Sequence, residues 1–277
     1  MAGRRHAAGE QVDRDEQVDR DERDDHDGRV AAVEGATDVP QGTPAARLAD
    51  VCARRAAVYQ ALVLGFGEPS EPYLAALVDG ELVEGLREAV AWLGPDAVSY
   101  EPALTALGHA GGQAAKLGAA ALRALAVEHA RMFSGPGHPA VMCYASQYLD
   151  GDGRVTGRLN GAAAAYAAAA YQAQGVTTVP QPRELPDYVA TELEFLFHLC
   201  RREEDAWAHD DGDTALGLRR ALDRFLGEHA SRWLPEFAAA VSAATAVELY
   251  RALADLLVAH LSAEFGVRRA GDGAPST

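Results

Sequence analysis

The sequence predicts an all-α protein, and two observations carry this prediction. Apolar residues recur at spacings of three and four over most of residues 45–268, which is the periodicity of a buried helical face. Glycine and proline interrupt this periodicity at short intervals, as they do between helices. An alternating strand pattern is weak and confined to residues 176–179. We therefore expect one bundle-like domain of about nine to eleven helices.

An acidic tail is expected before this domain. Residues 1–44 carry six arginines against twelve acidic residues, a net charge of −6, and have few large apolar side chains. Such a segment cannot bury enough apolar surface to offset the entropy lost on ordering. We expect disorder over residues 1–44 and again over residues 269–277. Arg4 and Arg5 precede no apolar stretch, so the chain is not expected to be exported itself.

The first half of the domain is divided by its glycines and prolines. A long apolar stripe predicts a first helix over residues 43–66, ended by Gly65 and Gly67. Shorter helices are expected over residues 70–78, 81–93 and 102–110. The Gly111-Gly112 pair is expected to end the last of these before an alanine-rich helix over residues 113–133.

The middle of the chain alternates between irregular and helical segments. Residues 134–154 contain too much glycine and proline for regular structure but too many apolar residues for a free loop, so this segment should lie on the bundle surface. An alanine-rich helix should follow, to about Gln174. Residues 175–186 then form a hinge-like, proline-containing connection.

A central helix is expected from Pro186 to about His209. Pro186 suits the first turn of a helix, and Asp187 favours the positive end of the helix dipole. Glu192 has only apolar or aromatic side chains three and four positions away, so its carboxylate needs a partner from elsewhere in the fold. Glu194 should lie nearer the polar rim. Further helices are expected over residues 214–233, 234–243 and 245–265.

Composition restricts the possible partners. A net charge of −16 and a pI near 4.9 oppose nucleic-acid binding, because that binding requires cationic side chains to neutralise phosphates, and favour a basic peptide. No apolar span is long enough for membrane insertion. Three widely separated cysteines indicate neither a disulfide framework nor a zinc site and fit a reducing cytoplasm. We expect each cysteine to be a small buried apolar residue.

Three separated motifs stand out in the predicted domain. The first is HARMFSGPGHP over residues 129–139 with YASQYLDGDGR over residues 144–154. The second is PDYVATELEFL, which begins at Pro186. The third is FLGEHASRWLPEF over residues 225–237. In residues, order and spacing these motifs resemble the TorD/DmsD/NarJ family of cytoplasmic assembly chaperones for molybdenum oxidoreductases, and together they cover most of residues 45–265.

The resemblance implies a helical, non-enzymatic chaperone that holds an apo catalytic subunit until its cofactor is inserted, often by binding the twin-arginine leader peptide. Such a leader offers two arginines and then an apolar, helix-prone run, so its receptor needs carboxylates beside an aromatic groove. Asp187, Glu192 and Glu194 are the expected carboxylates. The expected groove and motif residues are Phe133, Pro136, Gly137, Tyr144, Ser146, Tyr148, Pro186 and Tyr188.

Tyr188 is a departure from the family, whose members commonly have histidine there. Tyrosine keeps a ring and a hydrogen-bonding tip but does not titrate near neutral pH. Structural interpretations also remain open: Phe133 is equally well a core residue, and His229 and Trp233 are favoured as structural.

Other functions find less support in the sequence. Hydrolase, P-loop and zinc-protease motifs are missing, and no cofactor is expected. Glu194 and His198 could bind a metal, but two ligands favour a salt bridge. The glycines of residues 134–139 could cradle a phosphate, yet no lysine follows them. An adaptor that binds the mature client without leader specificity is the more serious alternative. The chain could be a monomer or a homodimer.

Overall fold

The computed structural model describes residues 42–135, 139–149, 159–176 and 185–271. Within these ranges the chain is helical, and its β-structure is an isolated antiparallel bridge between Tyr144 and Tyr188. This confirms the all-α prediction. The α-helices are α1 (Pro44–Phe66), α2 (Glu71–Val78), α3 (Glu81–Val90), α4 (Glu101–Leu117), α5 (Ala121–His129), α6 (Ser146–Leu149), α7 (Ala162–Ala173), α8 (Val189–Ala208), α9 (Gly212–Glu228), α10 (Leu234–Ala244) and α11 (Glu248–Gly271).

Segments of 3₁₀-helix or π-helix link several of these helices. They are η1 (Ala91–Tyr100), η2 (Gly118–Ala120), the π-helical η3 (Ala130–Ser134) and η4 (Ala230–Arg232). Gly94, with φ of 56°, kinks η1 directly after the end of the helix predicted over residues 81–93. The predicted interruption between helices is therefore confirmed, although the chain there winds as 3₁₀ turns.

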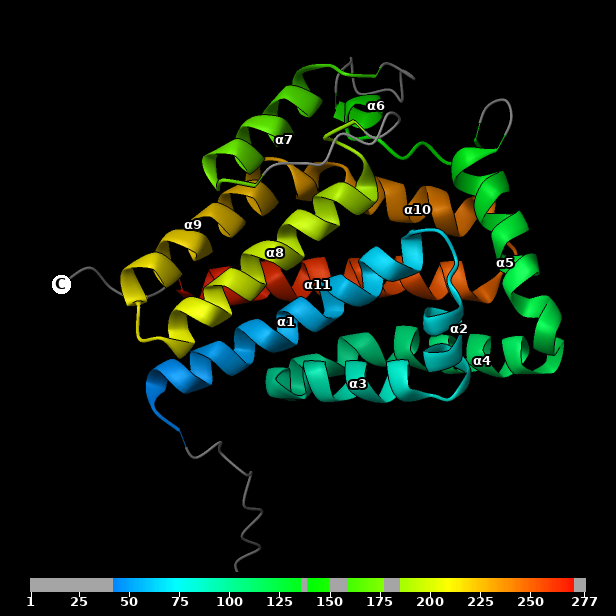
Figure 1. Cartoon of the computed structure of the whole chain (residues 1–277), viewed down its shortest axis with the longest axis horizontal. Coiled ribbons are helices and arrows are strands. Elements are labelled where there is room, and N and C mark those ends of the chain that lie inside the picture. Colours follow the sequence, from blue (N-terminus) through cyan, green and yellow to red (C-terminus); the bar gives the residue numbers. More distant parts are fainter. Residues whose placement is uncertain (1–41, 136–138, 150–158, 177–184, 272–277) are drawn as a thin grey trace, which may run out of the picture. The chain divides into compact units, whose positions relative to one another are not determined.

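The centre of the unit is the pair α1 and α8, which lie side by side along much of their length (Figure 1). Helix α9 packs against α8, while α11 packs against α1, α4 and α10. Tyr59, Leu193, Leu196 and Leu253 are fully buried where these helices meet. Burying a large apolar side chain stabilises the fold by about 1.5–3 kcal/mol, so the α1–α8 contact is a main source of stability.

The start of α1 follows the sequence rule for helix capping. The hydroxyl of Thr43 accepts a hydrogen bond from the backbone N–H of Ala46 at 3.2 Å, and Pro44 occupies the first helical position. The predicted helix over residues 43–66 is confirmed. Ser70 caps α2 in the same way by accepting from the N–H of Tyr73.

The predicted break at Gly111-Gly112 is wrong, because α4 runs through both glycines and ends at Leu117. Gly111 is buried against the carbonyl oxygen of Leu77, and a Cβ atom at this position would lie 2.3 Å from that oxygen. A Cβ at Gly112 would meet no atom within 4 Å. Gly111 therefore serves the close approach of α2 and α4. The chain instead breaks at Gly118, whose φ is 55°.

The central helix begins later than predicted. Helix α8 starts at Val189, and Tyr188 before it is extended, with φ of −74° and ψ of 139°. Pro186 and Asp187 form a turn rather than the first helical residues. The predicted start is wrong because the bridge to Tyr144 holds this stretch extended. The predicted end near His209 is confirmed.

The segment before α6 lies deeper than expected. Val141, Cys143 and Ala145 are buried, so residues 139–149 enter the core instead of lying on its surface. Cys52 and Cys200 are likewise free and buried, as predicted. Helix α11 extends to Gly271, so the predicted disorder is wrong for residues 269–271. The expectations about residues 1–41 and 272–277 of the tails, residues 150–154 of the first motif and most of the 175–186 connection concern residues outside the described ranges.

We predict opposite effects for alanine at the two adjacent glycines. Gly111→Ala should destabilise the protein by about 1–3 kcal/mol, because the new methyl group overpacks the α2–α4 contact. Gly112→Ala should stabilise it by up to about 1 kcal/mol through helix propensity. Thermal unfolding of both variants measures this difference. An unfolding temperature for Gly111→Ala at or above that of Gly112→Ala would contradict the assigned role.

Candidate functional site

Backbone hydrogen bonds join the first two sequence motifs. The N–H of Ala145 donates to the carbonyl of Asp187, and the N–H of Val189 donates to the carbonyl of Cys143, both at 2.9 Å. The rings of Tyr144 and Tyr188 lie above this bridge with centroids 5.4 Å apart, and both are half-buried. Four of the expected site residues, counting Ser146 and Asp187, are thereby brought together.

Asp187 is the more unusual of the two expected site carboxylates that are buried, Asp187 and Glu192. Its side chain is 0% exposed, and Oδ2 accepts a hydrogen bond from the N–H of Ser146 at 2.8 Å. This contact caps the first residue of α6. Oδ1 of Asp187 has no hydrogen-bond partner among the described residues, nor has the hydroxyl of Ser146. A buried carboxylate with one unmatched oxygen is costly, so the site is chemically incomplete.

Glu192 finds the partner that its helix does not supply. It is 0% exposed, with Oε2 accepting from the indole N–H of Trp233 at 2.9 Å and Oε1 lying 2.6 Å from Nε2 of His229. Burial raises the pKa of Glu192, and the contacts with His229 and Trp233 oppose that shift. The expectation that Glu192 has a partner outside its own helix is confirmed. That partner is the third motif, and the structural interpretation of His229 and Trp233 gains support.

The expected aromatic residues divide between this region and the core. Tyr148 packs against Trp233 with centroids 5.5 Å apart, and its hydroxyl donates to the carbonyl of Met142. Phe133 is 8% exposed and packs edge-on against Phe66 at 6.3 Å. The structure thus places Phe133 as a core residue, which was the open alternative.

The three expected carboxylates do not form one exposed rim. Glu194 faces solvent as predicted, whereas Asp187 and Glu192 are enclosed. Pro136 and Gly137 lie outside the described residues, and Pro186 is half-buried beside Asp187. Peptide binding by this set stays a prediction. In the conformation seen, a ligand would reach the two buried carboxylates only after a covering element moved.

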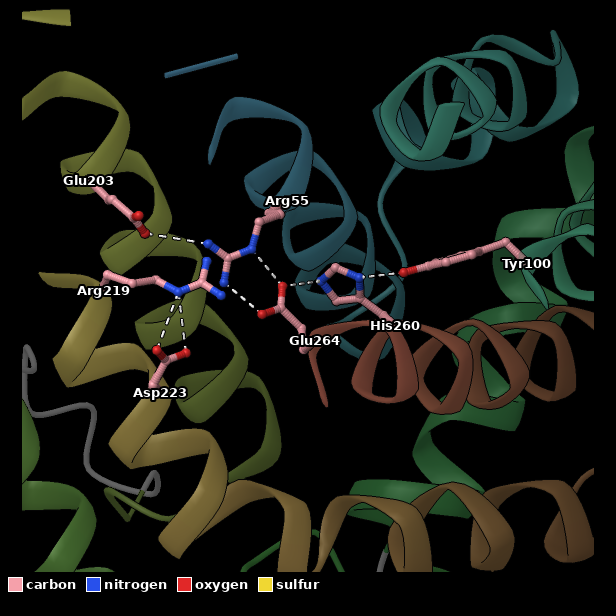
Figure 2. Close-up of polar contacts among 7 residues, drawn as sticks. All are labelled: Arg55, Tyr100, Glu203, Arg219, Asp223, His260 and Glu264. Atoms are coloured by element: carbon pink, nitrogen blue, oxygen red, sulfur yellow. Dashed lines mark hydrogen bonds and ion pairs between the residues drawn. The ribbon is translucent and has the colours of Figure 1, made fainter. Parts of the chain in front are cut away.

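A second buried polar cluster escaped the sequence analysis (Figure 2). Arg55 on α1 donates from Nε and Nη2 to the two carboxylate oxygens of Glu264 on α11, at 2.7 and 2.6 Å. Glu203 on α8 lies 3.3 Å from Nη1 of Arg55. The signal in the sequence was Arg55 itself, a charge within the apolar stripe between Cys52 and Tyr59.

The surroundings of Glu264 and His260 in this cluster shift the pKa values of both side chains. Although burial opposes ionisation, the Arg55 guanidinium lowers the pKa of Glu264 to about 2. Burial lowers the pKa of His260 to about 4, and Nδ1 of that ring lies 2.9 Å from the hydroxyl of Tyr100. Arg219 pairs with Asp223 at the edge of the cluster (Figure 2). The cluster joins three helices by paired charges and has the character of structural support.

Neither region shows a metal centre. The described ranges contain no group of three or more histidine, cysteine or acidic side chains placed to hold a metal. Within the same ranges, no helix combines the length and the hydropathy needed to cross a bilayer.

The sequence matches the family model described as nitrate reductase delta subunit over residues 79–239, more than half of the chain. The chain belongs to the nitrate reductase delta subunit family. This confirms the resemblance to the TorD/DmsD/NarJ chaperones and, with it, a family of chaperones rather than enzymes. The matched region contains every residue of the expected site, from Phe133 to Glu194.

Named relatives agree with this family. The selenate reductase assembly chaperone protein of Thauera selenatis is 41% identical over 95 residues, covering 34% of this chain and 45% of the relative. The chlorate reductase assembly chaperone protein of Ideonella dechloratans is 46% identical over 55 residues, covering 20% and 28%. Chaperone protein TorD of Vibrio cholerae is 30% identical over 137 residues, covering 50% and 59%.

The chain therefore spans less than two thirds of the length of each of these relatives. Among solved structures, a candidate redox enzyme maturation protein from Archaeoglobus fulgidus aligns with a TM-score of 0.41 at 20% identity, covering 79% of this chain and 96% of that one.

The shifted pKa of His260 predicts acid sensitivity. Between pH 6.5 and about 4 the unfolded chain binds a proton at His260 that the folded protein excludes, so stability is lost as pH falls through this window. His260→Gln should reduce the fall in unfolding temperature between pH 7 and pH 4. Other groups titrate in both proteins, so the difference between the two pH profiles isolates this ring. Parallel profiles would contradict the assignment.

Proposed function

We propose that this chain is an assembly chaperone that binds the apo catalytic subunit of a molybdopterin oxidoreductase and holds it until the cofactor is inserted and before export. Membership of the nitrate reductase delta subunit family supports this proposal. Two relatives named as selenate and chlorate reductase assembly chaperones point to the same class of client. The chain acts in the cytoplasm, and it carries out no reaction and requires no cofactor.

We further propose that the contact is to the client's twin-arginine leader. The observation that carries this step is the incomplete site at Asp187, where one carboxylate oxygen and the Ser146 hydroxyl are buried without partners among the described residues. No described cationic side chain pairs with Asp187. A guanidinium offers several donors in a fixed fork and would supply both the missing charge and the missing hydrogen bonds.

The surroundings of Asp187 fit the remainder of such a leader. The Tyr144 and Tyr188 rings give an apolar, half-buried surface beside the carboxylate, and exposed Glu194 adds negative charge nearby on α8. The net charge of −16 favours the approach of a basic segment. A few buried side chains at about 1.5–3 kcal/mol each, less the cost of ordering, give micromolar affinity and allow release.

Co-purification from the native host tests the proposed function. The tagged chain should retain a molybdenum oxidoreductase catalytic subunit that lacks its cofactor, identified by mass spectrometry and metal analysis. Recovery of unrelated proteins alone would refute the proposal. Deleting the client's leader should abolish recovery. If the leader-deleted client is recovered equally well, the chain is an adaptor for the mature client.

Asp187→Asn tests the arginine contact. The amide oxygen can still accept from the N–H of Ser146, but the charge is lost, so the dissociation constant for a leader peptide should rise about 10- to 100-fold. Fluorescence anisotropy with a labelled peptide measures this change. Glu84→Gln, an exposed carboxylate on α3, is the matched control and should bind normally. Equal affinities in two stably folded variants would remove Asp187 from the site.

A further inference from the structure

Helix α7 has a composition unlike the other helices of this acidic protein. Its twelve residues, AAAAYAAAAYQA, contain nine alanines and no charged side chain. An uncharged, helix-forming run of this kind is also what a twin-arginine leader offers after its arginines. The chain therefore contains a segment with the chemistry of its proposed ligand.

This helix lies over the buried carboxylates. The ring of Tyr166 stacks on His229, which binds Glu192, with centroids 5.0 Å apart and planes inclined by 14°. Tyr171 packs on Phe195 of α8 with centroids 4.6 Å apart. Burial, and then the nearby charges of Glu192 and Asp187, raise the pKa of Tyr171. Both carboxylates thus lie close to the face that α7 covers, and Figure 1 shows α7 along α9 near α6.

Helix α7 contacts the rest of the unit through small side chains and through the hydroxyl groups of two tyrosines. Ala163, Ala164 and Ala167 are the buried residues of α7 besides Tyr171. The hydroxyl of Tyr171 donates to the carbonyl of Pro186 at 2.7 Å, next to Asp187. The hydroxyl of Tyr166 donates to Glu228 at 3.0 Å. Alanine methyl groups bury little area, so the tyrosines supply much of what holds α7 in place.

The surface beneath α7 combines the features that a leader requires. Phe195 and Phe225 contribute an aromatic floor, with ring centroids 5.0 Å apart, and each also contacts Tyr171. Glu192 and Asp187 lie at this floor, although both are enclosed while α7 is docked. Removing α7 would therefore uncover these two rings beside the two carboxylates, whereas the closed form covers all four side chains.

We propose that α7 is an internal substitute for the client helix, and that the uncharged helical segment following the client's arginines displaces α7 from α8 and α9. This inference rests on the proposed function and adds the regulation of the same site. The free chaperone covers its own apolar surface with α7. Binding requires that α7 undock, so the measured affinity is the intrinsic affinity reduced by the undocked fraction.

A pair of alanine substitutions on α7 tests the proposal. Ala167 is 0% exposed on the buried face of α7, and Ala168 faces solvent on the same helix. Glutamine at either position changes helix propensity equally, but Ala167→Gln interferes with docking. The probe is a synthetic peptide with two adjacent arginines followed by a twelve-residue alanine and leucine run. Its dissociation constant should fall about tenfold in Ala167→Gln if α7 is undocked roughly a tenth of the time, and should not change in Ala168→Gln.

Two further measurements keep the test decisive if Ala167→Gln folds poorly. The double variant Tyr166→Phe with Tyr171→Phe removes both hydroxyl anchors but keeps both rings, and should also bind the peptide more tightly. In the wild-type protein, the amide hydrogens of α7 should exchange faster when the peptide is bound. Unchanged affinity in the variants, or slower exchange of α7 on binding, would overturn the inference.

The outcomes separate this inference from the proposed function. If the wild type binds the peptide and the variants bind it with the same affinity, the role proposed for α7 is refuted. The chaperone proposal then still stands. Failure of wild type and variants alike to bind the arginine-containing peptide, together with failure to recover a client, refutes both. A peptide with glutamates in place of the two arginines is the specificity control and should bind more weakly to every variant.

Discussion

The burial of Glu192 is the constraint on which this structure most depends. A carboxylate enclosed among apolar side chains must be matched within the fold, and its partners here are the Trp233 indole and the His229 ring, which follow α9. These contacts bind the central helix to the third motif. Through Trp233 they continue to Tyr148, so one buried carboxylate aligns all three motifs shared with the chaperone family.

The second buried cluster, which contains Arg55, Glu203 and Glu264, also holds separate helices together. The Arg55–Glu264 pair joins the first and last long helices, while Glu203 connects them to α8. The two clusters differ in how the charge of their carboxylates is compensated. Arg55 meets two carboxylates, whereas Asp187, in the motif region, retains an oxygen without a partner among the described residues. This difference is why we assign support to one region and recognition to the other.

Sequence patterns identified the helices well where local chemistry sets their ends. Thr43 and Pro44 determine the start of α1, and the apolar stripe determines its length. Local rules failed where a distant segment decided the outcome. Gly111 appeared to be a helix break because nothing nearby reveals the Leu77 carbonyl against it. Pro186 appeared to begin a helix because the bridge between Tyr144 and Tyr188 comes from residues far apart in the chain.

For the site, the sequence predicted which residues take part but not how deeply they are buried. The lack of a local partner for Glu192 was visible in its helical neighbours, whereas the hydrogen-bond partner of Asp187 comes from α6, 41 residues away in the chain. The bridge also has a kinetic consequence. Because it fixes the chain on both sides of α7, an undocked α7 stays near its place at high effective concentration. A bound client segment therefore competes with α7 of the same chain, whose effective concentration does not depend on the protein concentration. The client can dissociate without an external energy source.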